Sequence, residues 1–365
     1  MKKTLIAILF VCTLSFAAFG QKLGKPTLTS SPLTPAQQKT LQEGVVLHDS
    51  KNYVEAIAKY RSILAENPNA TLAMYELAFS LHDKGDKLEA VELANKGTRY
   101  ISDELPLFYL LMANNLDDLG KPDDAIKIYQ DGIKYLEGNK DYANYRASLQ
   151  YNLGITYYRV KKFKEARQVL KSAVENNFGY ASPHYLLSAI FAGTNYKIPA
   201  FLAACRLVSL EQNSARTRNS IATIMQTLQA TSKNPKTGNT VISLDMGGAV
   251  DEGDFGTVDL LFGMMMAGKI DKNKDKSENE VFIDALDTLT GLLTSEKKLA
   301  NSFVGKNYFP FMVDMKRSGN LETFGYIILF LGDKNNADAA KWIKANDGKL
   351  STFKTWAKAY RPSAQ

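Results

Sequence analysis

The clearest repeat in the sequence is residues 147–180, ASLQYNLGITYYRVKKFKEARQVLKSAVENNFGY. Its eighth and twentieth positions hold the small residues Gly154 and Ala166. Small residues there let two antiparallel helices approach closely, while large side chains such as Tyr157 and Leu170 fill the remaining holes. The stretch therefore predicts one helix-turn-helix unit.

The alanine at the twentieth position recurs along the first half of the chain. It is found as Ala56, Ala90, Ala125, Ala166 and Ala200, at intervals of 34, 35, 41 and 34 residues. A period near 34 residues is typical of a helical solenoid. Each unit is too small to bury its apolar face alone, so it stacks on its neighbours, and the stack leaves a concave surface suited to binding. We therefore expect an all-α solenoid of about five repeats and a binding protein.

In their residue types, the units resemble the tetratricopeptide repeat. The first unit has Gly44, Tyr53, Ala56, Tyr60 and Pro68 at the small, aromatic, small, aromatic and proline positions of that family. The resemblance covers about half of the chain, as the units 37–70, 71–104, 106–139, 147–180 and 181–214. The third interval is long by about seven residues at 137–146, where an extra turn or a break in the superhelix is expected.

The first twenty residues predict a cleaved bacterial signal peptide. Lys2 and Lys3 precede an apolar run from Leu5 to Phe19, with the small residues Ala18 and Gly20 just before Gln21. The run is shorter than the roughly 20 apolar residues that a membrane anchor needs. The mature chain would then be exported, to the periplasm or the outside, and would keep one cysteine, Cys205, so no internal disulfide is expected.

Composition divides the rest of the chain. A segment rich in glycine and asparagine at 231–257 follows the repeats, and five apolar runs of helical length come after it. The predicted organisation is a signal peptide at 1–20, a linker at 21–36, a solenoid with a capping helix at 37–230, a second linker at 231–257 and a smaller α-helical C-terminal domain at 258–365.

The resemblance also implies which side chains line the concave groove, namely those at set positions of each first helix. The candidate peptide-binding residues are His48, Asp49, Tyr75, Phe79, His82, Asp83, Leu110, Asn114, Asp118, Tyr151, Tyr158, Arg159 and Tyr185. Aromatic side chains dominate this set. An acidic row, Asp49, Asp83 and Asp118, is expected to rise through three stacked helices toward Arg159. An apolar groove with a few charges suits a helix or an extended peptide.

Other chemistries are less well supported by the sequence. His48 and His82 occupy one repeat position and could converge on a metal with Asp83 or Asp117, but a His-Asp pair that caps a helix end explains the spacing without one. The aspartates at 271–275 imitate a calcium loop without its glycine or its closing glutamate. We expect no cofactor, no metal and, because the basic residues are scattered among acidic ones, no nucleic-acid partner.

Two hypotheses for function follow. The first is an exported, non-catalytic scaffold whose groove binds a protein or peptide in cell-envelope assembly, with a membrane complex as a potential associate. The second is an envelope enzyme whose site lies in the C-terminal domain or at its junction with the repeats. Convergence of Asp251, Glu252, Asp254 and His184 in one cleft would favour the enzyme. No catalytic motif is visible, so the first hypothesis is favoured.

Overall fold

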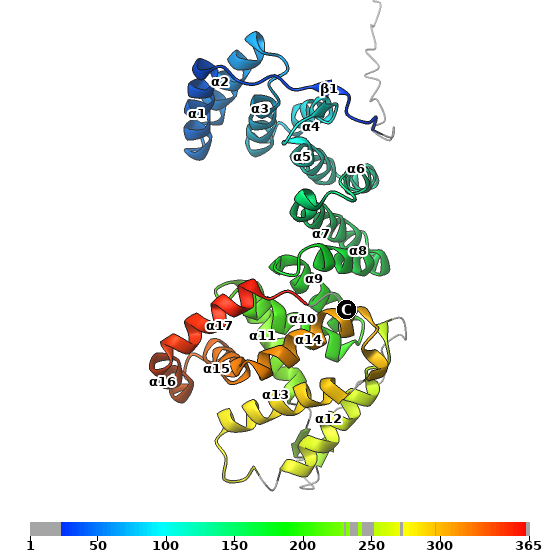
Figure 1. The fold of residues 1–365 in the computed structure, drawn as a ribbon, viewed down its shortest axis with the longest axis vertical. Helices are drawn as coiled ribbons and strands as arrows, with labels where there is room; N and C mark the ends of the chain where they lie inside the picture. Colours follow the sequence, from blue (N-terminus) through cyan, green and yellow to red (C-terminus); the bar gives the residue numbers. More distant parts are fainter. Residues whose placement is uncertain are drawn as a thin grey trace, which may run out of the picture. The chain divides into compact units, whose positions relative to one another are not determined.

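The structure is a computed structural model that describes residues 23–229, 231–233, 240–242, 252–270, 273–295 and 297–362. This part of the chain is all-α apart from two pairs of short strands, as the repeat pattern predicts (Figure 1). It forms two compact units, unit 1 (residues 1–131) and unit 2 (residues 132–365). The predicted signal peptide lies outside the described residues. No helix in the described ranges is long and apolar enough to cross a membrane.

Unit 1 is a stack of antiparallel helical hairpins. Its helices are α1 (Pro35–Asp49), α2 (Tyr53–Glu66), α3 (Thr71–Lys84), α4 (Lys87–Gly97), α5 (Leu105–Asp118) and most of α6 (Pro122–Tyr135). The small positions work as predicted, because a Cβ added to Gly44 would lie 2.6 Å from the ring of Tyr60. Ala56 and Ala90 are fully buried between helices.

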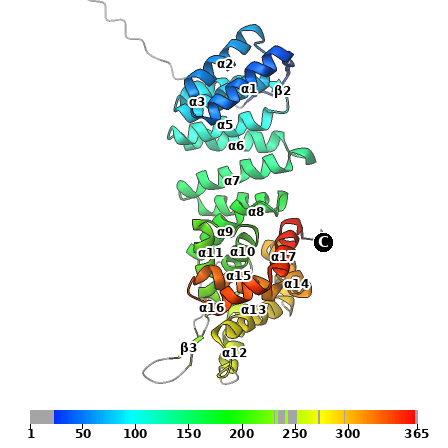
Figure 2. The ribbon, with the colours of Figure 1, turned by 90° about the vertical axis from the view of Figure 1, so that its left-hand side faces the viewer.

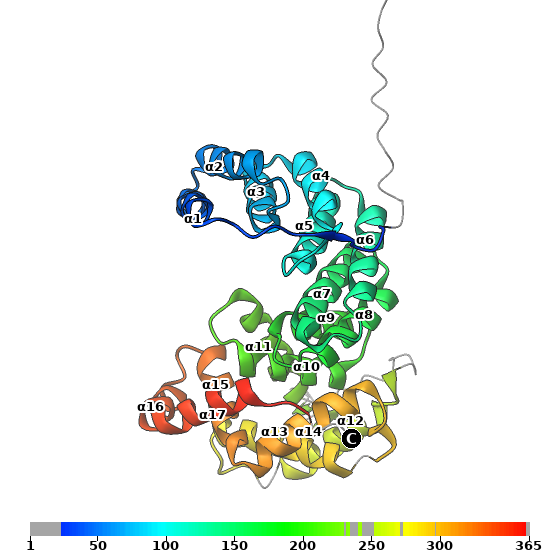
Figure 3. The same ribbon diagram turned by 45° about the horizontal axis from the view of Figure 1, so that its top comes forward.

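An extended N-terminal segment, residues 23–34, ties the repeats of unit 1 together and is called the strap here (Figure 3). Its strand β1 (Leu28–Thr29) pairs in parallel with β2 (Tyr100–Ile101), which follows α4. Further along, the Ser31 amide donates a 2.9 Å hydrogen bond to the carbonyl of Asn69 after α2. The segment expected to be a linker is therefore bonded to two loops between repeats.

Unit 2 continues the repeat pattern. Its repeat helices are α7 (Ala143–Arg159), α8 (Phe163–Asn176), α9 (Ala181–Gly193), α10 (Lys197–Leu210) and α11 (Ala215–Leu228). The expected extra turn is present as the short helix η1 (Lys140–Tyr142). Arg146 fixes it, because its Nη1 donates to the carbonyls of Leu136 and Asn139 over 2.7 Å each.

Six further helices of unit 2 gather around α10 and α11 (Figures 2 and 3). They are α12 (Gly256–Lys269), α13 (Glu278–Ser295), α14 (Phe303–Arg317), α15 (Asn320–Gly332), α16 (Ala337–Ala345) and α17 (Asp347–Ala359), with η3 (Lys297–Leu299) before α14 and the hairpin of β3 (Thr231–Lys233) and β4 (Thr240–Ile242) before α12. They share one hydrophobic core with α8–α11. As a result, twelve residues of α10 are buried, which is more than an outer helix of a repeat requires.

The C-terminal helices differ from expectation in two ways. Sequence periodicity predicts five of them and misses α14, whose interior carries Pro310. The expected boundary at 231–257, most of which is not described, is not where the compact units divide. They divide inside α6, because α12, α14 and α17 pack against α10 and so join the last repeats to the C-terminal helices.

Two buried carboxylates form three ion pairs that fasten the start of this C-terminal region to the repeats. Glu252 lies 3.0 Å from Nε of Arg167 on α8 and also pairs with Lys171. On α12, Asp259 lies 2.8 Å from Nζ of Lys197 on α10. Buried charges are stable only when they are paired, so these contacts fix the C-terminal region against two successive repeats.

Candidate peptide-binding groove

The first helices of unit 1 bring four predicted groove residues together in a row of rings, called the ring ladder here. His48 of α1 stacks on Phe79 of α3 with centroids 4.9 Å apart. Along α3, Tyr75 and Phe79 stack in parallel at 6.0 Å, and Phe79 and His82 at 6.5 Å. The prediction that these side chains share one surface is therefore consistent with the geometry of unit 1.

Helix geometry explains the order of the ladder. Tyr75, Phe79 and His82 are spaced by four and three residues, so they lie above one another on a single face of α3. Their rings are half-buried, and Leu72, on the same helix, is exposed. The surface is thus apolar, open to solvent and built on a rigid helix, as a docking surface for side chains requires.

Hydrogen bonds fix both imidazoles of the ladder. The Nδ1 atom of His48 lies 2.8 Å from the hydroxyl of Ser80, and its Nε2 lies 3.3 Å from the carboxylate of Asp83. The Nδ1 of His82 lies 2.9 Å from Oδ1 of Asn115, whose own amide donates to a backbone carbonyl of α5. Nδ1 of His82 is therefore the donor, and each histidine joins two neighbouring repeats.

The predicted acidic row is only partly free. Asp118 forms a 2.9 Å ion pair with Lys87, which compensates its charge, and the carboxylate of Asp83 lies 3.3 Å from Nε2 of His48. Asp49 is exposed near the half-buried Glu76. Burial, with a further contribution from Asp49, raises the pKa of Glu76. The acidic character of the groove is therefore strongest where α1 meets α3.

The remaining predicted residues of unit 1 lie on α5. Leu110 is half-buried, and Asn114 accepts a hydrogen bond from the hydroxyl of Tyr129 on α6. Asn114 thus helps to hold its hairpin together, a role that its repeat position does not reveal.

The two histidines have a carboxylate in common as their neighbour. Both Nε2 atoms face Asp83, at 3.3 Å for His48 and 3.9 Å for His82. Among the residues that the structure describes, no three histidine, cysteine or carboxylate side chains are arranged to hold a metal ion. Histidine here bridges repeats through hydrogen bonds.

Unit 2 carries its own row of tyrosines on α7 and α9. The ring of Tyr151 meets that of Tyr180 edge-on at 5.5 Å, and the hydroxyl of Tyr185 accepts a 3.3 Å hydrogen bond from Asn219 of α11. Tyr158 packs instead against Phe163 at the α7–α8 turn, and Arg159 is exposed beside it. The predicted residues of unit 2 therefore fall into a tyrosine row and a separate turn.

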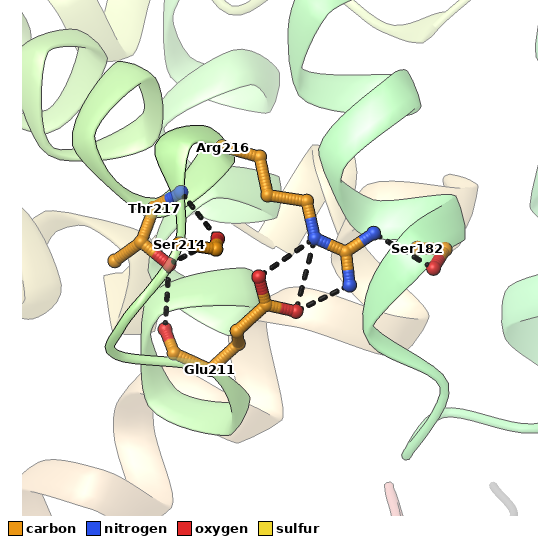
Figure 4. Close-up of polar contacts among 5 residues, drawn as sticks. All are labelled: Ser182, Glu211, Ser214, Arg216 and Thr217. Carbon is orange, nitrogen blue, oxygen red and sulfur yellow. Dashed lines mark hydrogen bonds and ion pairs between the residues drawn. The ribbon is translucent and has the colours of Figure 1, made fainter. Parts of the chain in front are cut away.

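Helix α11 contributes residues to the same surface that are not among the predicted groove residues. Arg216 of α11 donates a 2.9 Å hydrogen bond to the hydroxyl of Ser182 and donates to both carboxylate oxygens of Glu211 (Figure 4). Ser182 and Arg216 are 34 residues apart, as are Tyr185 and Asn219. One more step of the repeat period would have found both Arg216 and Asn219, so α11 is the first helix of a sixth repeat as well as a cap.

The residues that would have favoured an enzyme have different partners. His184 is buried and bonded to the hydroxyl of Tyr308 and the carbonyl of Phe178, while Glu252 pairs with basic residues of α8. Asp254 is exposed and accepts from the amide of Gly256, and the fourth candidate, Asp251, is not described. Cys205 is a fully buried free thiol, as expected, and burial raises its pKa.

The comparison with protein families agrees with this geometry. Residues 110–181 match the model described as tetratricopeptide repeat. This segment of the chain is therefore built of tetratricopeptide repeats. Together with the hairpins on either side of the matched segment, this makes the protein an all-α scaffold of the kind that mediates protein interactions. Comparison with curated proteins gives no match.

Solved structures similar to the chain include other tetratricopeptide repeat proteins. PilF of Pseudomonas aeruginosa is 17% identical with a TM-score of 0.45, over 52% of this chain and 84% of that one. A thermophilic repeat protein of Thermus thermophilus is 17% identical with a TM-score of 0.41, over 52% and 99%. YrrB, described as having an unusual peptide-binding site, is 15% identical with a TM-score of 0.37, over 50% and 89%.

Proposed function

We propose that the protein is an exported scaffold that binds a protein or peptide partner on the ring ladder of unit 1. The observation that carries this proposal is the continuous stack from His48 through Phe79 to Tyr75 and His82, half-buried and spread over two repeats. Rigid aromatic surface of this kind supplies most of the affinity in protein interfaces.

The chemistry of the ladder describes the partner. Stacked rings favour apolar or aromatic side chains, and the neighbouring carboxylates of Asp49 and Glu76 favour a basic residue. The bridges at Ser80 and Asn115 hold both imidazoles before a ligand arrives, which reduces the entropy lost on binding. A peptide with apolar side chains and a flanking lysine or arginine fits this surface.

Export belongs to the proposal because the N-terminal sequence has the features of a signal peptide. Cell-envelope assembly is the proposed setting, since an exported scaffold without a visible catalytic motif meets its partners there. Mass spectrometry of the N-terminus after expression in a bacterial host checks this step. A chain that begins at Gln21 in the periplasmic fraction supports export, whereas an intact N-terminus in the cytoplasm contradicts it.

The binding proposal is tested by selecting peptides on the whole chain from a random display library and measuring their affinity by fluorescence anisotropy. The double variant Tyr75→Ala/Phe79→Ala should weaken binding of the selected peptides at least about 30-fold, because hot-spot truncation costs about 2 kcal/mol or more. Circular dichroism and a thermal melt check that the variant folds.

A matched control removes exposed apolar side chains elsewhere. Met264 and Phe330 are 55% and 36% exposed on helices of unit 2. The variant Met264→Ala/Phe330→Ala should change affinity less than about threefold. Equal weakening by both variants, or none by the ladder variant, would contradict binding at the ring ladder.

A further inference from the structure

The turn between α7 and α8 exposes two aromatic rings at its ends. Tyr158 is 42% exposed and Phe163 is 41% exposed, and their rings meet at 5.4 Å with an interplanar angle of 63°. Phe163 holds the same repeat position as Tyr53, but Tyr53 is half-buried whereas Phe163 is exposed. Together the two rings form a small exposed apolar patch, which a partner could contact.

Three lysines stand between and beside these rings. Lys161, Lys162 and Lys164 are exposed, and none of them has an ion-pair partner within the described ranges. The nearest acidic residue in the sequence is Glu165, so the segment 158–165 is strongly basic. We call Tyr158, Lys161, Lys162, Phe163 and Lys164 the turn patch.

Basic residues further along α8 differ from those of the turn patch, because their charges are compensated. Further along α8, Arg167 and Lys171 are both paired with the buried Glu252. The helix therefore has its positive charge compensated where it is covered by the C-terminal region and uncompensated where it meets solvent. The unpaired lysines remain available to an anionic partner.

The backbone holds one of these lysines in an unusual conformation. Lys161 has a φ of 62°, in the left-handed region that side chains with a Cβ disfavour. The equivalent residues of the second and third repeats are Gly85 and Gly120, with φ of 99° and 73°. The equivalent residue of the first repeat is another lysine, Lys51, with a φ of 64°. The turn geometry therefore does not require lysine, and at Lys161 the cation is present despite the backbone preference.

We propose that the turn patch binds the surface of a bilayer that contains anionic phospholipid. Aromatic side chains partition into the headgroup region, and each lysine near an anionic surface strengthens binding about fivefold. Single-stranded nucleic acid stacks its bases on open ring faces, whereas Tyr158 and Phe163 pack edge to face on each other at 63°. This surface is separate from the ring ladder and does not depend on it.

The experiment is vesicle co-sedimentation of the whole chain with phosphatidylcholine vesicles that contain about 30 mol% phosphatidylglycerol, compared with pure phosphatidylcholine. The test variant is Lys161→Gln/Lys162→Gln/Lys164→Gln. The matched control, Lys341→Gln/Lys344→Gln/Lys354→Gln, removes the same charge from exposed positions on α16 and α17. All proteins carry the same N-terminus, so its apolar run contributes equally.

The turn variant should bind the anionic vesicles about 100-fold more weakly, and the control should stay within about threefold of the parent. Tyr158→Ser/Phe163→Ser should also weaken binding, but its residual binding should still fall with added salt because the lysines remain. Circular dichroism confirms folding of each variant.

Three outcomes would overturn the proposal. The first is that the parent chain binds anionic and neutral vesicles equally. The second is that the two lysine variants lose binding equally, which would indicate a non-specific effect of net charge. The third is that the parent binds a single-stranded oligonucleotide of about 20 nucleotides through the turn lysines while ignoring vesicles, which would assign the turn patch to nucleic acid.

Discussion

Arg206 of α10 donates a 2.8 Å hydrogen bond to the carbonyl of Ala357, 151 residues further along the chain. Its guanidinium is fully buried and lies 4.5 Å from the ring centroid of Phe178 and 4.9 Å from that of Phe311. Burial, with a further contribution from Arg361, lowers the pKa of Arg206 to about 9. The fifth repeat thus holds the end of α17 through a cation that lies between aromatic rings and backbone carbonyls.

Replacing Arg206 by lysine should destabilise unit 2 although the charge is kept. Lysine lacks the planar group that stacks on Phe178 and Phe311 while donating in several directions. We expect a loss of about 3 kcal/mol in the free energy of unfolding, because buried carbonyls lose their donors. Urea unfolding followed by tryptophan fluorescence measures it, since both tryptophans lie in unit 2. The exposed Arg218→Lys should change stability by less than about 0.5 kcal/mol; similar losses for both variants would contradict the argument.

Glu252→Gln should release the C-terminal region from α8. The Glu252 side chain is 1% exposed and compensates both Arg167 and Lys171. Without its charge these cations are left near a neutral amide in a buried place, which costs about 3–5 kcal/mol. The same fluorescence experiment reports the loss. Glu165 is an exposed carboxylate on α8, and the control variant Glu165→Gln should leave the free energy of unfolding nearly unchanged. An unchanged midpoint for Glu252→Gln would show that this ion pair does not fasten the region.

Gly154→Ala tests the close packing of α7 on α8. A Cβ at Gly154 would lie 2.7 Å from Cδ2 of Leu170, so the buried Leu170 side chain or the helices must shift, at about 1–3 kcal/mol. Gly291→Ala is the matched control in the interior of α13, where an added Cβ meets nothing within 4 Å. There alanine should stabilise the helix by about 0.5–1 kcal/mol. Opposite signs of the two changes in unfolding free energy are the expected result, and equal signs would count against close approach as the role of Gly154.

The repeats could be predicted from the sequence because their signal is local and periodic. Gly44, Gly154 and the recurring alanines have to be small wherever two helices touch, so their spacing alone reveals the hairpins. The ring ladder followed for the same reason, since Tyr75, Phe79 and His82 occupy positions that face one way in any such helix.

Contacts between distant segments could not be predicted in this way. The strap pairs Leu28 with Tyr100 through backbone hydrogen bonds, which leave no mark in side-chain patterns. The join of the last repeats to the C-terminal helices rests on pairs such as Glu252 with Arg167, each of which is an ordinary charged residue in sequence. Helix α14 was hidden because Pro310 interrupts its pattern, although packing against α10 and α13 sustains it.

The buried imidazole of His184 should make unit 2 sensitive to acid. Burial, with a further contribution from Arg206, lowers its pKa to about 3, whereas in the unfolded chain it titrates near 6.5. Between these values the unfolded state binds more protons, so the contribution of His184 to stability is complete above pH 6.5 and is lost as the pH falls toward 3.

The loss from this histidine should reach about 2 kcal/mol between about pH 7 and pH 5. His184→Gln retains a donor for the carbonyl of Phe178 and an acceptor for the hydroxyl of Tyr308, but it does not titrate. Urea unfolding at several pH values, followed by tryptophan fluorescence, should therefore show a flatter pH dependence for His184→Gln than for the parent, whatever its stability at neutral pH. Parallel curves for the two proteins would mean that the imidazole is protonated without penalty in the folded state.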